Sequence, residues 1–158
     1  VRFGNVLNSS GSVLQIFRSS QEKNKPFPIT NKKMTRFFIT HKGAVELCLY
    51  ALSNMNGGEI FVRSMGAANI VKLAQAFAGK KNIDLKIVGL KSGEKLYEEL
   101  ITEDEALRTT FKNGYYKINI ELSKTNRKKN INNKIINSIN SNIDNLTWQD
   151  LRKLIQIS

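Results

Sequence analysis

The alternation of hydrophobic and polar residues changes its period several times along the chain. Runs rich in β-branched and aromatic residues predict extended segments or strands at 1–7, 26–30, 37–40, 59–62, 85–88 and 115–120. Apolar residues at helical spacing predict amphipathic helices that begin near residues 13, 41, 67, 94, 103 and 147, the second of them capped by Thr40. Strands separated by helices in this way indicate a mixed α/β fold.

Several of the predicted helices begin with a polar residue and a partner three positions later, the spacing of a capping box. These pairs are Ser12 with Gln15, Thr102 with Glu105, and Thr147 with Asp150. The pairs fix where the helices begin. We expect the last of these helices to dock on the rest of the chain and to bury Trp148.

One stretch, residues 89–100, combines a glycine-bounded turn with groups suited to a ligand. It follows the apolar run 85–88 and leads into a helical pattern. A helix that begins at the carboxyl end of a strand favours anions. Lys91 would offer positive charge to a phosphate, and Glu94 would accept hydrogen bonds from sugar hydroxyls. The alternative is an ordinary strand-to-helix turn with solvated charges.

Composition narrows the class of protein. The chain has 158 residues, the length of one domain, and 41% of them are apolar, which predicts a globular core. Its formal net charge of +12 favours an anionic partner, which a nucleic acid, an anionic membrane or a phosphorylated metabolite could supply. No run approaches the length of a membrane span and no signal peptide is recognisable, so we expect a cytoplasmic protein without a membrane partner.

Cysteine and histidine are each present once, as Cys48 and His41. One cysteine excludes an intrachain disulfide and fits a reducing compartment. Because Cys48 lies among Val45, Leu49 and Leu52, we predict that it is a small buried hydrophobe. With one histidine and one cysteine, the usual His/Cys metal clusters are excluded, and we assign no metal ligands.

The two ends of the chain differ from its middle. A strand at 1–7 begins at the first residue, and because free termini fray, we expect the natural domain to extend upstream. Residues 121–145 are rich in Lys, Asn, Ser and Ile and predict a basic low-complexity arm. The predicted organisation is a ligand-binding part at 1–120, the arm at 121–145 and a C-terminal docking helix at 146–158.

Five motifs follow one another over residues 1–120: RFGNV at 2–6, GSV at 11–13, MTRFF at 34–38, GEIFV at 58–62 and GLKSGEKL at 89–96. In order and separation they resemble the C-terminal half of bacterial polysaccharide-biosynthesis enzymes of the extended short-chain dehydrogenase/reductase superfamily. These enzymes are the UDP-N-acetylglucosamine 4,6-dehydratases and the CapD-like UDP-sugar epimerases. The resemblance implies the substrate-binding part of a Rossmann-type α/β fold, with the N-terminal dinucleotide-binding half missing.

The resemblance also implies roles for particular residues. Asn5 matches the family's asparagine that approaches the nucleotide-sugar, and segment 26–30 matches the wall beside the uracil. Arg36 matches the arginine beside the pyrophosphate, where a guanidinium can bind two phosphate oxygens. Lys91 and Glu94 match a diphosphate-binding arginine and a ribose-binding glutamate. Lysine in place of arginine exchanges a bidentate fork for a point charge, which predicts lower affinity.

The family's chemistry uses NAD or NADP, held by a Gly-rich turn, and a Tyr-x-x-x-Lys pair that moves a proton. The sequence contains no G-x-G-x-x-G motif, and no tyrosine is followed four residues later by lysine. We therefore expect no cofactor site and no catalytic residue in this chain. It would bind a UDP-sugar and be inactive alone, with the missing half or further copies of itself as partners.

Two other classes of function stay open. A non-catalytic scaffold remnant would keep the fold without the activity. A basic nucleic-acid-binding protein would use the arm at 121–145, but no helix-turn-helix, zinc-finger or RNA-binding signature supports it, so nucleic acid is disfavoured as a partner. The motifs do not distinguish a dehydratase from an epimerase.

Overall fold

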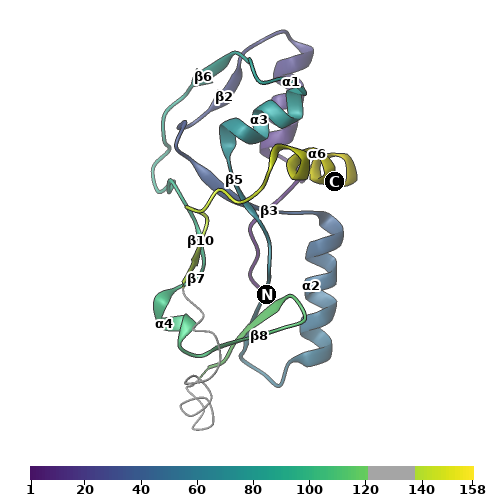
Figure 1. Cartoon of the computed structure of the whole chain (residues 1–158), viewed down its shortest axis with the longest axis vertical. Coiled ribbons are helices and arrows are strands. Elements are labelled where there is room, and N and C mark those ends of the chain that lie inside the picture. The colour runs from purple at the N-terminus through teal and green to yellow at the C-terminus, as the bar shows by residue number, and fades with distance from the viewer. Residues whose placement is uncertain (121–137) are drawn as a thin grey trace.

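The computed structural model describes residues 1–120 and 138–158, and it is an elongated α/β fold (Figure 1). Its helices are α1 (Val13–Glu22), α2 (His41–Asn54), α3 (Ile70–Ala78), α4 (Glu103–Ala106) and α6 (Trp148–Ile157). Its strands are β1 (Asn5–Val6), β2 (Phe27–Ile29), β3 (Thr35–Ile39), β4 (Ile60–Arg63), β5 (Ala67–Asn69), β6 (Leu85–Ile87), β7 (Glu99–Ile101), β8 (Thr109–Lys112), β9 (Tyr115–Ile118) and β10 (Ile139–Asn140).

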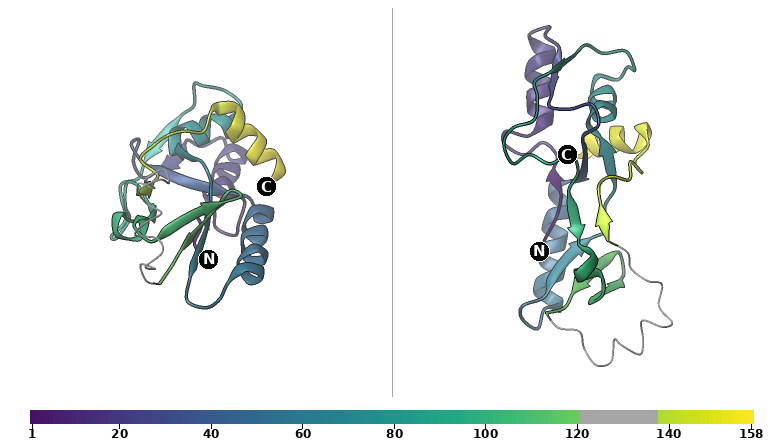
Figure 2. Two further views of the ribbon diagram at one scale, coloured as in Figure 1. Left: turned by 60° about the horizontal axis from the view of Figure 1, so that its bottom comes forward. Right: turned by 90° about the vertical axis from the view of Figure 1, so that its left-hand side faces the viewer.

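The strands form small sheets, with β3 near the middle of the molecule (Figures 1 and 2). β3 pairs parallel with β1 and antiparallel with β5, while β2 pairs parallel with β6. An antiparallel sheet has the order β4-β9-β8, and β7 pairs antiparallel with β10. The mixture of parallel pairs and helices confirms the predicted α/β class.

Strand β3 is buried along its whole length because it separates two hydrophobic cores. Phe38 faces a core that contains Leu14 and Phe17 of α1 and Leu151 of α6. Phe37, on the opposite face, belongs to a second core with residues of β4, β7 and β9. Successive side chains of a strand point to opposite faces, so adjacent phenylalanines can serve two cores.

The C-terminal helix packs on the first core. Leu151 of α6 is fully buried there, whereas Trp148 packs against the same core but is only half-buried, so the predicted burial of Trp148 is not met. The Thr147 hydroxyl accepts a hydrogen bond from the Asp150 N–H, and the Asp150 carboxylate accepts one from the Thr147 N–H. The same capping box is present at Thr102 and Glu105, so both predictions are confirmed.

One predicted capping box and one predicted helix start are corrected. Ser12 is the N-cap of α1, but its hydroxyl makes no cap hydrogen bond, and Gln15 accepts instead from the Gly11 N–H at 3.1 Å. Helix α3 begins at Ile70 rather than near residue 67, because β5 pairs with β3 over 67–69. The Asn69 side chain then caps α3.

The prediction that Cys48 is buried is wrong. Cys48 is exposed, together with Val45 and Leu49, whereas Leu47 and Ala51 form the buried face of α2. Leu47 packs on Phe61 of β4. Apolar residues occur on both sides of this helix, so their spacing predicts the helix but not which face is covered.

Other predictions lie partly outside the described residues. Of the predicted arm at 121–145, the structure describes 138–145, a stretch that contains β10 and the fully buried Ser141. Within 1–120 and 138–158, no helix has both the length and the apolar character needed to cross a membrane.

Candidate functional site

The stretch that the sequence singles out, 89–98, is a loop and not a helix start. It leaves the end of β6, turns at Gly89 and Gly93, both with positive φ, and enters β7 at Glu99. The predicted helix from residue 94 is therefore wrong. The carbonyls of Lys95 and Leu96, which a helix would use internally, accept hydrogen bonds from a side chain of β3 instead.

That side chain is Arg36, which exposes only 7% of its surface. Its Nη1 donates to the carbonyls of Thr35 at 2.8 Å and Leu96 at 3.1 Å, and its Nη2 donates to that of Lys95 at 2.6 Å. The Thr35 N–H also donates to the Leu96 carbonyl at 3.0 Å. Strand β3 thereby holds the backbone of the loop in an irregular path.

Two carboxylates lie beside the remaining edge of the same guanidinium. Glu94 Oε1 is 3.9 Å from Nη2, and Glu98 Oε1 is 3.8 Å from Nε. Both distances are longer than a hydrogen bond, so these are ion pairs without direct proton donation. The Nε/Nη2 edge of an arginine is one of the two edges of the guanidinium that can bind an oxyanion in a bidentate manner.

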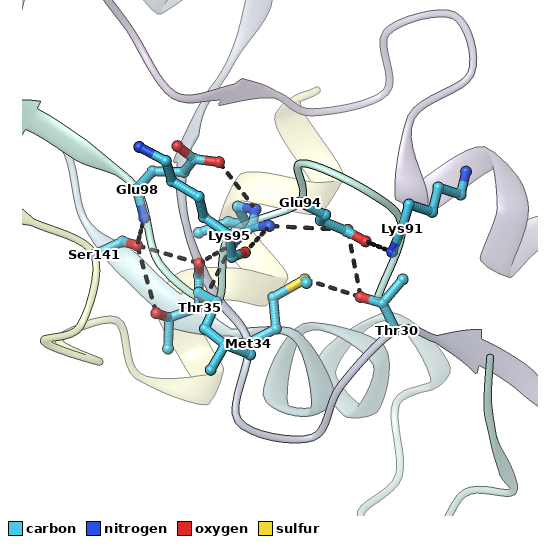
Figure 3. Close-up of polar contacts among 10 residues, drawn as sticks. Thr30, Met34, Thr35, Lys91, Glu94, Lys95, Glu98 and Ser141 are labelled. Atoms are coloured by element: carbon cyan, nitrogen blue, oxygen red, sulfur yellow. Dashed lines mark hydrogen bonds and ion pairs between the residues drawn. The ribbon is translucent and has the colours of Figure 1, made fainter. Parts of the chain in front are cut away.

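Glu94 also closes the turn that carries Lys91 (Figure 3). Its Oε2 accepts from the Lys91 N–H at 3.0 Å, and its own N–H donates to the Lys91 carbonyl at 3.0 Å. The Thr30 hydroxyl, which follows β2, donates to Glu94 Oε1 at 3.4 Å. The Lys91 side chain is exposed and points away from this cluster.

Ser141 attaches the loop to the C-terminal segment. Its hydroxyl accepts from the Glu98 N–H at 2.8 Å and donates to the Thr35 carbonyl at 3.2 Å. The Ser141 N–H donates to the Glu98 carbonyl at 2.8 Å. A single fully buried serine therefore joins β3, the start of β7 and the segment after β10.

The structure brings together three of the four predicted site residues. Arg36, Glu94 and the backbone of Lys91 meet at the loop. Asn5 lies on β1 opposite Phe38, two residues along β3 from Arg36, and makes none of the cluster's contacts among the described residues. Cavities of about 190 and 160 Å³ elsewhere in the described fold are lined by none of the four.

Glu98 and Ser141 belong to this cluster, but no motif in the sequence points to them. Glu98 stands in a run of helix-forming residues, and its neighbour Glu99 gives the same signal. Ser141 lies in an Asn- and Ser-rich stretch with no motif. Their positions follow from contacts between distant segments, which local patterns do not encode.

Two carboxylates on other elements have strongly lowered pKa values. Hydrogen bonding to the Arg2 guanidinium lowers the pKa of Glu105 to about 2, and the Lys117 ammonium does the same for Glu59. Arg2 also donates to the Leu100 carbonyl at 2.8 Å, so its pair with Glu105 joins the N-terminal segment to β7 and α4. Both carboxylates stay ionised at neutral pH and serve as structural anchors.

The chain is similar to known proteins of polysaccharide biosynthesis and to enzymes named for UDP-sugars. The family model described as "Polysaccharide biosynthesis protein" matches residues 1–143. The capsular polysaccharide biosynthesis protein CapD of Staphylococcus aureus is 45% identical over 111 residues, which are 66% of this chain. A UDP-N-acetylglucosamine 4,6-dehydratase (inverting) of Campylobacter jejuni is 40% identical over 118 residues, and a UDP-glucose 4-epimerase of Rickettsia felis is 38% identical over 120; each match covers 74% of the chain.

A solved structure is similar over nearly the whole chain. Pen from Bacillus thuringiensis superposes with a TM-score of 0.82 and 33% sequence identity, covering 98% of this chain and 47% of its own. The matches cover 35% of the dehydratase and of the epimerase, and 18% of CapD. The chain therefore spans about a third or less of the length of these curated relatives.

Proposed function

The chain belongs to the polysaccharide biosynthesis protein family, and on this basis we propose that it is the nucleotide-sugar-binding part of a UDP-sugar 4,6-dehydratase or epimerase. The family match confirms the resemblance given by the five motifs. The observation that carries the proposal is the meeting of the loop 89–98 with a segment about 60 positions earlier. The residue after β2, the start of β3 and the loop meet around the buried guanidinium of Arg36.

Arg36 is the candidate for the diphosphate. Its Nη1 end is held by two carbonyls, so the guanidinium is already oriented before a ligand arrives. The Glu98 and Glu94 carboxylates lie beside its Nε/Nη2 edge at 3.8 and 3.9 Å, and phosphate oxygens could replace the carboxylate of Glu98. A pre-oriented charged donor costs little entropy on binding.

The loop would supply two further contacts. The exposed ammonium of Lys91 can approach the outer phosphate as a point charge. The Glu94 carboxylate, which now accepts from the Thr30 hydroxyl, can accept from a ribose hydroxyl in its place. Asn5, on the neighbouring strand β1, would lie toward the sugar.

Dehydration or epimerisation of such a sugar uses NAD or NADP as the hydride acceptor, and the described residues do not fit a dinucleotide. The parallel strands β1 and β3 lead into helices through residues 7–12 and through Thr40, and neither connection is a Gly-rich turn. We therefore assign no step of the reaction to this chain. By this proposal it binds the substrate and has no activity alone.

Titration of the chain with UDP by calorimetry tests the proposal. We expect saturable binding that Lys91→Met weakens by roughly fivefold, because an exposed charge contact is worth up to about 1 kcal/mol. Lys42→Met, at an equally exposed lysine on α2, is the matched control and leaves the affinity unchanged.

Each alternative predicts a different result. A scaffold remnant shows no saturable UDP binding. Salt-sensitive binding of DNA without any response to UDP would support the nucleic-acid alternative. An equal loss of UDP affinity in Lys42→Met and Lys91→Met would mean that Lys91 acts only through the net charge of the chain and does not contact the ligand.

A further inference from the structure

We propose that the Glu98 carboxylate is an internal counter-ion of Arg36 that an incoming diphosphate displaces, so that Glu98 sets the affinity of the site for phosphorylated ligands. The inference rests on the proposed function, because it concerns the same edge of Arg36. It adds to that function a residue that competes with the ligand.

The N–H groups of Arg36 that have no acceptor in the described part of the chain identify the edge of the guanidinium that is available to a ligand. An arginine has five N–H groups. Both hydrogens of Nη1 and one of Nη2 are directed to the carbonyls of Thr35, Leu96 and Lys95. The Nε–H and the second Nη2–H remain, and no described residue accepts from them within hydrogen-bond distance.

The two carboxylates beside this edge differ in how firmly they are held. Glu94 is fixed by the Lys91 N–H and the Thr30 hydroxyl. The Glu98 side chain is 46% exposed, and its carboxylate has no hydrogen bond among the described residues. Glu98 is held through its backbone, by Ser141, so its carboxylate can turn into solvent without breaking the fold.

A diphosphate at the Nε/Nη2 edge would lie where the Glu98 carboxylate now balances the buried charge. Two anions cannot share that position, because like charges at such distances repel. Ligand binding must therefore displace Glu98, and the lost ion pair reduces the net affinity. Removing the charge at position 98 removes this competition and leaves the diphosphate as the counter-ion of Arg36.

Calorimetric titration of the wild-type chain, Glu98→Gln and Glu99→Gln with UDP, uridine and inorganic pyrophosphate tests the inference. Glutamine is isosteric with glutamate, and Glu99 is the adjacent exposed carboxylate. We expect Glu98→Gln to bind UDP and pyrophosphate roughly two- to fivefold more tightly than wild type, the range for a partly exposed ion pair. Glu99→Gln should match wild type, and uridine, which lacks phosphates, should bind all three chains equally.

The outcomes separate this inference from the proposed function. If the wild type binds UDP but Glu98→Gln binds it no more tightly, or Glu99→Gln gains as much, only the role of Glu98 is overturned. A gain for uridine would also overturn it. If the wild type does not bind UDP, the proposed function fails, and the inference then stands or falls on whether Glu98→Gln strengthens pyrophosphate binding.

Discussion

The Ser141 hydroxyl accepts a hydrogen bond from the Glu98 N–H at 2.8 Å although the two residues are 43 positions apart. The same hydroxyl donates to the Thr35 carbonyl at 3.2 Å. All of Ser141 is buried, so water cannot replace either bond. The geometry of the loop over Arg36 therefore depends on one side chain from the C-terminal segment.

Replacing this hydroxyl should destabilise the fold. Ser141→Ala leaves the Glu98 N–H and the Thr35 carbonyl without this partner, and we expect a loss of about 1–3 kcal/mol in the free energy of unfolding. Chemical denaturation measures it, with Ser92→Ala in the exposed part of the loop as the control. A loss no larger than that of Ser92→Ala would mean that other groups hold the loop.

Gly4 is required for the close approach of the N-terminal segment to β3. A Cβ at Gly4 would lie 2.4 Å from the Phe37 Cβ and 2.6 Å from the Phe37 carbonyl oxygen. Because backbone cannot move aside cheaply, we expect Gly4→Ala to cost about 1–3 kcal/mol. Gly11→Ala is the comparison, since Gly11 has a φ of +71° but nothing within 4 Å of the added carbon. Its cost should reflect backbone strain alone, about 1 kcal/mol, and a cost equal to that of Gly4→Ala would contradict the steric explanation.

Arg36 should be a stability residue as well as a ligand contact. Arg36→Ala removes the side-chain donor to the Lys95 carbonyl, one of the two donors to the Leu96 carbonyl, and the counter-ion of two carboxylates. We expect it to cost about 2–4 kcal/mol in denaturation experiments. Arg18→Ala, on the exposed face of α1, should stay within about 0.5 kcal/mol of wild type. UDP binding by Arg36→Ala should be measured without denaturant, at a temperature where the variant is folded. Arg36→Lys, which keeps the charge, provides the milder comparison.

Acid should weaken the contact between the N-terminal segment and α4. The folded-state pKa of Glu105 is about 2, below its ordinary value of 4.5, because Arg2 donates hydrogen bonds to the carboxylate. A lowered folded pKa gives stability that is fully present above the unfolded pKa and is lost as the pH falls from about 5 toward 2. We expect this contribution to be about 1–3 kcal/mol at pH 7.

Glu105→Gln should remove that part of the pH dependence while its amide keeps the helix cap. The difference in the free energy of unfolding between wild type and Glu105→Gln should therefore be smaller at pH 3 than at pH 7. Glu103→Gln, at an exposed position of the same helix, is the control and should retain the wild-type slope. A Glu105→Gln variant with an unchanged slope would refute the assignment.

Cys48 should react with a thiol reagent in the native protein. The side chain is exposed on α2, so labelling with an aromatic disulfide should proceed at a similar rate in the presence and absence of denaturant. A thiol buried in the core would react only after unfolding. Much slower labelling of the native chain would restore the buried interpretation that the sequence favours.

Local sequence signals predict the helices that carry their own capping residues. The capping boxes at Thr102 and Thr147 mark the starts of two helices in the structure, and the glycine after Ala78 marks the end of a third. The family resemblance predicts that β3 and the loop 89–98 meet. The helix expected from Glu94 fails because Arg36, 59 and 60 positions earlier, binds the carbonyls of Lys95 and Leu96. Helix propensity is a weak preference that such tertiary contacts override.

The site was predictable only in part for the same reason. The family motifs select Asn5, Arg36, Lys91 and Glu94, of which Asn5 lies outside the cluster around Arg36. They do not select Glu98 or Ser141, whose roles arise from contacts across 62 and 43 to 106 positions respectively. The face of α2 that packs on β4 could not be predicted either, because a helix with apolar residues on both sides can bury either side.

The bond between Ser141 and Thr35 has a consequence for the order in which the protein matures. The two residues are 106 positions apart, and non-local closures form late. During synthesis, β3 and the loop leave the ribosome long before Ser141 does. The polar cluster around the Arg36 guanidinium is thus completed only after residue 141 has been made, so the end of the loop 89–98 lacks its link to β3 through Ser141 until then.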